Sequence, residues 1–287
     1  MNNIYDVRGG RGGDAYLIVG DQKTALIDCG MAYCAQTLIE NIKNVIPNRP
    51  LDYILLTHAH YDHIGAVPYL KTEWPNLIVL GSEYDQAILK RPNALATIRD
   101  LGRQAAGIYA EGLIENYNDD LMKIDSSIAE GAMVTLGNIS IKVIETPGHT
   151  RCTLSFLIND EILFVSESCG VLSQSGTIYP GFLVSYYEAI KSIGKCQMLH
   201  PRFIYSSHYG LIDPHYMPHF WQDCIKAAEE SRSFILKRAE LGYSEAEILS
   251  AFEEVFRDEE SRSEQPFNAF RINTQAMIQN LLSTNPA

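Results

Sequence analysis

A short segment of the sequence concentrates groups that bind metal ions. Three histidines and one aspartate occur in H-A-H-Y-D-H, as His58, His60, Asp62 and His63, directly after an apolar stretch. Imidazole and carboxylate are ligands that Zn²⁺ and Fe²⁺ accept, and a turn lets neighbouring side chains point at two different ions. A single buried histidine is more often a hydrogen-bonded core residue, but packing four such groups together without a metal carries a large desolvation cost. We therefore predict that all four bind metal.

Two more histidines stand in similar places. Each ends a predicted strand in a turn that contains glycine, T-P-G-H-T for His149 and S-S-H-Y-G for His208. Ligands that come from several strand ends are what a site at the edge of a sheet requires. The other histidines, His200, His215 and His219, lack this context, so we expect them at the surface or in a supporting position.

The residues before and after the histidine segment alternate between strand and helix patterns. Apolar runs on both sides of a G-D turn predict a hairpin, and apolar residues at helical spacing predict helices. The predicted order is strands 15–19 and 24–28, helix 38–46, strand 51–56, helix 65–72, strand 77–80 and helix 83–90. A further helix over 92–113 is weakened by Gly102 and Gly107, and we expect it to cover a pocket.

Sheet character returns in the middle of the chain and then ends. Strands are predicted at 139–144, 153–158, 161–165 and 203–206, with a helix that starts after Ser185. Beyond residue 216 the pattern indicates three helices, with a break near Gly242 and a capping box formed by Ser244 and Glu247. We predict a main catalytic domain over 1–215 and a helical extension over 216–287 that packs on it.

Taken in order, these motifs resemble the metallo-β-lactamase superfamily. The resemblance rests on H-x-H-x-D-H after a strand, then a G-H-T turn, then a distal histidine at a strand end, and it spans residues 14 to about 210. Asp28, in L-I-D-C-G, matches the structural aspartate that the family has after its second strand. The resemblance implies a mixed α/β fold of the α+β kind, an αββα sandwich with the metals at one edge of the sheets.

The same resemblance implies two divalent transition-metal ions, with zinc ranked first and iron or manganese as alternatives. Carried over residue by residue, the first ion would be bound by His58, His60 and His149. The second would be bound by Asp62, His63 and His208.

Glu167 stands where family members usually have an aspartate that bridges the two ions. We predict that Glu167 is a metal ligand, with its extra methylene absorbed by a shift of the backbone or a changed rotamer. The alternative is an ordinary turn whose carboxylate lies in solvent. Cys169 is an alternative ligand, because a nearby thiolate can bind a soft metal.

The chemistry that follows is hydrolysis by a metal-bound hydroxide, with Asp62 as the catalytic residue that accepts a proton and passes it to the leaving group. The helical extension resembles that of glyoxalase II and of the quinolone-signal response thioesterase. No cationic cluster suited to a glutathione thioester is recognisable, so an apolar acyl ester or thioester is favoured. The alternatives are a regulatory or binding protein that keeps its metals with little activity, and a phosphodiesterase. Substrate-binding residues are not assigned.

The charge and cysteine content of the chain limit the classes of partner that we expect. The chain has 23 lysines and arginines against 35 aspartates and glutamates, a formal charge of -12 without a long basic run, which disfavours nucleic acid. No signal peptide or membrane span is recognisable, so we expect a cytoplasmic protein with no membrane partner. The six scattered cysteines suggest small buried side chains and no disulfide framework. A small-molecule substrate is expected, and a homodimer is left open.

Overall fold

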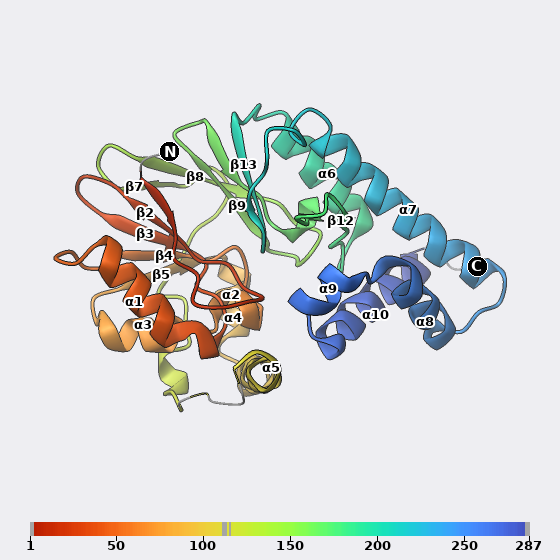
Figure 1. Cartoon of the computed structure of the whole chain (residues 1–287), viewed down its shortest axis with the longest axis horizontal. Helices are drawn as coiled ribbons and strands as arrows, with labels where there is room; N and C mark the ends of the chain where they lie inside the picture. Colours follow the sequence, from red (N-terminus) through yellow and green to blue (C-terminus); the bar gives the residue numbers. More distant parts are fainter. Residues whose placement is uncertain (1–2, 111–113, 115, 285–287) are drawn as a thin grey trace. The chain divides into compact units, whose positions relative to one another are not determined.

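The computed structural model describes residues 3–110, 114 and 116–284. The chain divides into two compact units (Figure 1). The first comprises Met1–Ile144 and Phe156–Asn159, and the second comprises Glu145–Ser155 and Asp160–Ala287. The division predicted at residue 215 stays a prediction.

A six-stranded sheet forms the centre of the first unit. Its strands, in spatial order, are β1 (Ile4–Asp6), β2 (Tyr16–Val19), β3 (Thr24–Ile27), β4 (Tyr53–Leu55), β5 (Ile78–Gly81) and β6 (Ser126–Ser127). The antiparallel hairpin of β2 and β3 was predicted, and β3, β4 and β5 run parallel. Because parallel strands end at the same edge of a sheet, the residues after β3 and β4 come together there.

The helices of this unit are η1 (Ala32–Cys34), α1 (Ala35–Val45), α2 (Tyr61–Ile64), α3 (Val67–Glu73), α4 (Glu83–Ile88), α5 (Pro92–Tyr109) and η2 (Asp119–Leu121). Apolar side chains of α1 and α3 pack in one cluster with those of the sheet, among them Leu38, Leu70 and Ile54. The predicted helix 65–72 begins later, with Pro68 in its first turn, and the separate short helix α2 precedes it. Helix α5 was also predicted, but residues 111–113 of that prediction lie outside the described residues.

Three more strands follow, β7 (Met133–Thr135), β8 (Ser140–Glu145) and β9 (Leu154–Ile158), and β7 pairs antiparallel with β8. Strands at the positions of β8, β9 and β10 were predicted from their apolar runs. Asn159 and Asp160 both have positive φ, 48° and 54°, at the tight turn after β9. Asparagine and aspartate tolerate this left-handed backbone better than most residues do.

In the second unit, β10 (Ile162–Phe164) pairs parallel with β13 (Phe203–Ser206), and β13 pairs antiparallel with β14 (Gly210–Leu211). A small hairpin of β11 (Val171–Leu172) and β12 (Ile178–Tyr179) lies between them in sequence. The turn η3 (Glu167–Cys169) follows β10, and helix α6 (Tyr186–Gln197) starts after Ser185, whose hydroxyl accepts a hydrogen bond from the backbone of Glu188.

The C-terminal helices are α7 (Phe220–Glu240), α8 (Glu245–Phe256), α9 (Glu259–Glu264) and α10 (Phe267–Thr284) (Figure 1). The prediction of three helices was wrong, because the described part of this region has four. Helix α9 is only 6 residues long, too short to show an apolar periodicity, and it is capped by Asp258. A buried cluster that includes Ile235, Ile248, Phe252 and Ile278 holds α7, α8 and α10 together.

Hydrogen bonds tie α9 to the small hairpin. The carboxylate of Glu260 accepts from the backbone amides of Gln174 at 2.8 Å and Ser175 at 3.1 Å. The hydroxyl of Tyr179 donates to Asp258 at 2.5 Å. The helical region is therefore joined to the strand-bearing part of its own unit by polar as well as apolar contacts.

Among the residues that the structure describes, no helix combines the length and the apolarity that crossing a bilayer requires.

The predicted capping box of α8 gives a testable contribution to stability. Ser244 Oγ accepts from the backbone of Glu247, and Glu247 accepts from the backbone of Ser244 at 2.7 Å. Ser244→Ala should lower the free energy of unfolding by about 1 kcal/mol, whereas Ser233→Ala, at an exposed site within α7, should not. Urea unfolding of both variants checks this.

The acidic member of the capping box adds a dependence on pH. Hydrogen bonds from Ser244 lower the pKa of Glu247. Its contribution is therefore present above the unfolded pKa and lost as the pH falls through the lowered folded value. Glu247→Gln should be less stable than the parent at neutral pH and equal to it in acid, while Glu254→Gln, on the same helix, should match the parent throughout. A Glu247→Gln deficit that persisted in acid would contradict this reading.

Candidate metal centre

The histidine turn, residues 58–63, lies in the first unit and runs from beyond the end of β4 into α2. Its backbone is held by α2 itself, because the carbonyl of His60 accepts from the amides of His63 at 3.0 Å and Ile64 at 3.1 Å. The ring of His58 lies 4.2 Å from that of His63 and 4.4 Å from that of His60, measured between centroids. Strand end and helix start thus bring three imidazoles together.

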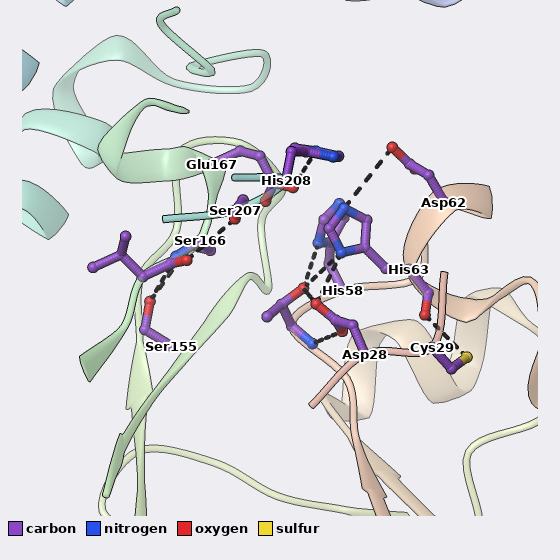
Figure 2. Close-up of polar contacts among 12 residues, drawn as sticks. Asp28, Cys29, His58, Asp62, His63, Ser155, Ser166, Glu167, Ser207 and His208 are labelled. Atoms are coloured by element: carbon purple, nitrogen blue, oxygen red, sulfur yellow. Dashed lines mark hydrogen bonds and ion pairs between the residues drawn. The ribbon is translucent and has the colours of Figure 1, made fainter. Parts of the chain in front are cut away.

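One buried carboxylate, that of Asp28, organises this turn (Figure 2). It follows β3 and adopts a positive φ of 52°. Asp28 Oδ1 accepts from the Thr57 amide at 2.8 Å, and Oδ2 accepts from the Thr57 hydroxyl at 2.8 Å. Oδ2 also lies 2.8 Å from Nδ1 of His63. Asp28 is 2% exposed and His63 is 1% exposed, so these bonds form without competing water.

The network fixes the tautomers of two histidines. An ionised carboxylate only accepts hydrogen bonds, so both the Thr57 hydroxyl and Nδ1 of His63 must donate to Asp28. The Thr57 oxygen then accepts from Nδ1 of His58, which lies 3.0 Å away. Both rings therefore carry their proton on Nδ1, which makes Nε2 the nitrogen that would coordinate a metal.

Burial raises the pKa of Asp28, while its interaction with His63 and the hydrogen bonds from Thr57 oppose that shift. These three donated hydrogen bonds favour the ionised carboxylate, which can only accept and so keeps the proton of His63 on Nδ1.

Glycines hold the histidine turn against the N-terminal segment. A Cβ on Gly13 would lie 2.6 Å from the carbonyl oxygen of Asp62, and one on Gly65 would lie 2.5 Å from the amide nitrogen of Ala32. Neither position admits a side chain without moving backbone. No residue pattern marks the roles of Gly13 and Gly65, and the role of Thr57 is signalled only by its position directly before His58.

The second unit supplies the other predicted ligands. His149 lies 5% exposed in the turn after β8. Its amide donates to the hydroxyl of Ser168 at 2.9 Å, and its Nδ1 lies 2.8 Å from the carbonyl oxygen of Gly181. Because a carbonyl only accepts, Nδ1 carries the proton here too, and Nε2 is again the coordinating nitrogen. Gly181 supplies a backbone atom from a distant segment, so no residue pattern could have identified it.

Glu167 and His208 lie together in the second unit (Figure 2). Glu167 Oε1 is 3.3 Å from Nε2 of His208. His208 follows β13 with a positive φ of 67°, and the neighbouring hydroxyl of Ser207 donates to the carbonyl of Val165 at 3.1 Å. Glu167 lies in η3 and is 4% exposed, so its carboxylate is buried and does not lie in solvent.

The remaining histidines and Cys169 do not belong to these groups of ligands. His200, His215 and His219 are exposed, as expected. Cys169 is fully buried, and the pKa of its thiol is raised by a hydrogen bond with Cys196 and by burial. Within the described residues, no group of potential metal ligands includes Cys169.

The donor set suits a transition metal. Asp62 Oδ2 lies 3.9 Å from Nε2 of His63. The ligand atoms of His58 and His60 lie within 4.8 Å of each other, and so do those of His58 and His63. Imidazole nitrogens whose far side is hydrogen-bonded, together with carboxylates, are what zinc, iron and manganese bind in proteins. Each unit therefore presents part of a donor set that fits these ions.

The comparison with protein families agrees with the motifs. The model of the metallo-β-lactamase superfamily matches residues 8–208, which is well over half of the chain and includes all seven predicted ligands. This chain belongs to the metallo-β-lactamase superfamily.

Individual relatives are distant. A metallo-β-lactamase fold-containing protein of Sulfurisphaera tokodaii is 26% identical over 218 residues, covering 75% of this chain and 79% of the relative. A hydroxyacylglutathione hydrolase of Xylella fastidiosa is 30% identical over 165 residues, covering 58% of this chain and 48% of the relative. The second match spans about half of that protein.

Solved structures share the fold. A metallo-β-lactamase superfamily protein from Sulfolobus tokodaii aligns with a TM-score of 0.65 and 21% identity, covering 98% of both chains. A metallo-β-lactamase family protein from Thermus thermophilus gives a TM-score of 0.60 and 18% identity, covering 99% of this chain and 94% of that one. The predicted fold class, mixed α/β with a C-terminal helical region, is confirmed.

The tautomer network predicts the effect of one conservative change. In Asp28→Asn, one of the two carboxylate oxygens becomes an NH₂ group, which donates and cannot accept. In one orientation this NH₂ faces the Thr57 amide, and in the other it faces Nδ1 of His63, so a donor meets a donor either way. Relief of this conflict moves the His63 proton to Nε2 and blocks coordination there. Metal affinity should fall about 10- to 100-fold, measured by competition with a chromophoric chelator. Asp52→Asn, which removes a carboxylate that accepts from Thr24 at 2.9 Å, is the control and should keep full affinity. Equal affinities in the two variants would refute the network.

Proposed function

We propose that this protein is a dinuclear metal-dependent hydrolase that acts on an ester or thioester. The observation that carries the proposal is the set of imidazoles whose Nδ1 atoms are engaged by Thr57, Asp28 and Gly181, so that each would coordinate through Nε2. Such an arrangement positions ligands before metal arrives. Membership of the superfamily and the likeness to a hydroxyacylglutathione hydrolase support hydrolysis.

The proposed ligand sets are those that the sequence motifs imply. One ion is assigned to His58, His60 and His149, and the other to Asp62, His63 and His208. Glu167 is proposed to contact at least one ion from beside His208. Zinc is ranked first, with iron or manganese as alternatives, because the donors suit all three.

Held by these residues, divalent ions would supply a nucleophile at neutral pH by lowering the pKa of water to about 7, and they would polarise the carbonyl of the substrate. Asp62 is proposed to accept the proton of the attacking water and to deliver it to the leaving oxygen or sulfur. Its side chain is 19% exposed, so it can reach solvent and substrate, unlike the fully buried Asp28 that orients His63. The two aspartates therefore have separate roles, one positioning a ligand and one moving a proton.

The first test is metal content and activity together. Protein purified without added metal should hold close to two transition-metal ions per chain and hydrolyse simple thioesters and aryl esters. His60→Ala should lose metal and most activity together, whereas His215→Ala, at an exposed histidine, should lose neither. Elemental analysis and steady-state rates decide this. Full metal content in His60→Ala would reject the ligand assignment, and two ions without turnover would favour a binding protein.

The second test concerns the longer acid at Glu167. Two cations a few ångströms apart repel strongly, and an anion near both offsets that repulsion. Glu167→Gln keeps the shape but removes the charge, so it should lower the occupancy of at least one site. Glu167→Asp keeps the charge and should retain metal. Metal titration of both variants checks the order, and a Glu167→Gln protein that binds and turns over like the parent would show that Glu167 is no ligand.

A further inference from the structure

One backbone atom, the carbonyl oxygen of Gly181, orients the candidate ligand His149. Nδ1 of His149 lies 2.8 Å from it and donates to it. Which nitrogen of a neutral imidazole is protonated is set by the hydrogen bond that the other nitrogen makes. If this oxygen moved away, the proton of His149 could occupy Nε2, the nitrogen that a metal needs. The position of Gly181 therefore matters to the candidate metal centre, and both residues lie in the second unit.

The small hairpin that precedes Gly181 depends on its surroundings for its own position. Strands β11 and β12 are joined by two pairs of residues. An isolated two-stranded hairpin is at best marginally stable in water, so contacts with the rest of the unit must hold this one. On β11, the amide of Leu172 donates to the hydroxyl of Ser206 at 3.0 Å. On β12, which leads to Gly181, the contact comes from the C-terminal helices.

Helix α9 holds β12 at its last residue, Tyr179. The hydroxyl of Tyr179 donates to Oδ1 of Asp258 at 2.5 Å, and a hydrogen bond to a carboxylate is stronger than one between neutral groups. Burial and this hydrogen bond raise the pKa of Tyr179, so its hydroxyl stays protonated and remains a donor. The same Oδ1 accepts from the amide of Ser261 at 2.9 Å, which caps α9 and fixes the acceptor. Glu260 of the same helix holds the hairpin turn.

The link from Tyr179 to Gly181 is stiff. Pro180 stands between them, and its ring fixes its own φ and restricts the residue before it. On the other side of Gly181, Phe182 is 1% exposed and packs in the buried cluster of α7, α8 and α10. Gly181 itself lies against η3, because a Cβ there would be 2.3 Å from the carbonyl oxygen of Glu167. The C-terminal helices thus hold the residues on both sides of this carbonyl.

We propose that Tyr179 and Asp258 are positioning residues for the metal centre, because their hydrogen bond fixes the Gly181 carbonyl that keeps the proton of His149 on Nδ1. The C-terminal helices then do more than bury apolar surface, since they set the tautomer of a candidate ligand. The alternative is that this contact stabilises α9 and has no effect on His149. The consequence for metal binding rests on the proposed function, whereas the consequence for the tautomer does not.

The tautomer is measured on the whole chain freed of metal, from long-range ¹H–¹⁵N correlations of the imidazole rings at a pH where they are neutral. Tyr179→Phe removes the hydroxyl and keeps the ring. In this variant the Nε2–H form of His149, which the parent should lack, is expected to appear. Tyr187→Phe, at an exposed tyrosine of α6, is the control and should match the parent. The signals of His63, whose proton is held by Asp28, should not change in either variant.

Zinc affinity, measured by competition with a chromophoric chelator, is a second readout. Tyr179→Phe should weaken one of the two zinc ions about tenfold, as when the partner of a ligand is disturbed, and leave the other unchanged. Asp258→Asn keeps an oxygen that can accept from both Tyr179 and Ser261, so it should behave like the parent, whereas Asp258→Ala should resemble Tyr179→Phe. Glu260→Gln should shift both readouts in the same direction, and Glu259→Gln, on the same helix, should shift neither.

These measurements separate the inference from the proposed function. A His149 tautomer that is the same in the parent, Tyr179→Phe and Asp258→Ala would overturn the inference, even if both variants unfold at a lower temperature. A shifted tautomer with unchanged affinity for both ions would support the positioning role and reject His149 as a ligand. A shifted tautomer and a weakened ion in a protein that hydrolyses no ester would support the inference and contradict the proposed activity.

Discussion

The hydrogen bonds donated to the carboxylate of Asp28 are the constraint on which the histidine turn depends. One buried acid accepts from the amide and hydroxyl of Thr57 and from Nδ1 of His63, and through the Thr57 oxygen it also sets the tautomer of His58. A buried carboxylate is costly unless its hydrogen bonds are satisfied, and here each bond also orients a candidate ligand. The same hydrogen bonds that stabilise the buried charge of Asp28 therefore also position the candidate ligands.

Strand topology makes that arrangement available. Asp28 directly follows β3 and Thr57 comes soon after β4, and these strands are parallel neighbours, with Ile27 opposite Leu55. The amide of Asp28 donates to the carbonyl of Leu55 at 3.0 Å, which continues the ladder to the point where the chain turns. Had β3 and β4 been antiparallel, the two residues would lie at opposite edges of the sheet. A positive φ at Asp28 then turns the carboxylate toward Thr57.

The candidate ligands could be predicted from the sequence because their side-chain types are recognisable. The contacts made by backbone atoms could not be predicted, because any residue can supply them. Histidines at strand ends are visible as a pattern, and so is an aspartate after an apolar strand. The carbonyl of Gly181, which holds His149, has no side-chain signature and lies far along the chain. The position of Glu167 was predicted, but its placement in a 3-10 turn beyond β10 required the backbone. Helix α9 was missed because one and a half turns show no periodicity.

The glycines of α5 show that a helix-weakening residue can be interpreted only once its surroundings in the fold are known. Both were read from sequence as sources of weakness in a helix over a pocket. The structure gives them different surroundings: Gly102 is buried and opens on a cavity, whereas Gly107 is exposed and nothing in the structure explains it. Only the first combines an unfavourable residue with space that a side chain would fill. Arg99, on the same helix, pairs with Asp119 of a separate segment. The ionic partner of a side chain on this helix is therefore set by the fold and not by spacing along the chain.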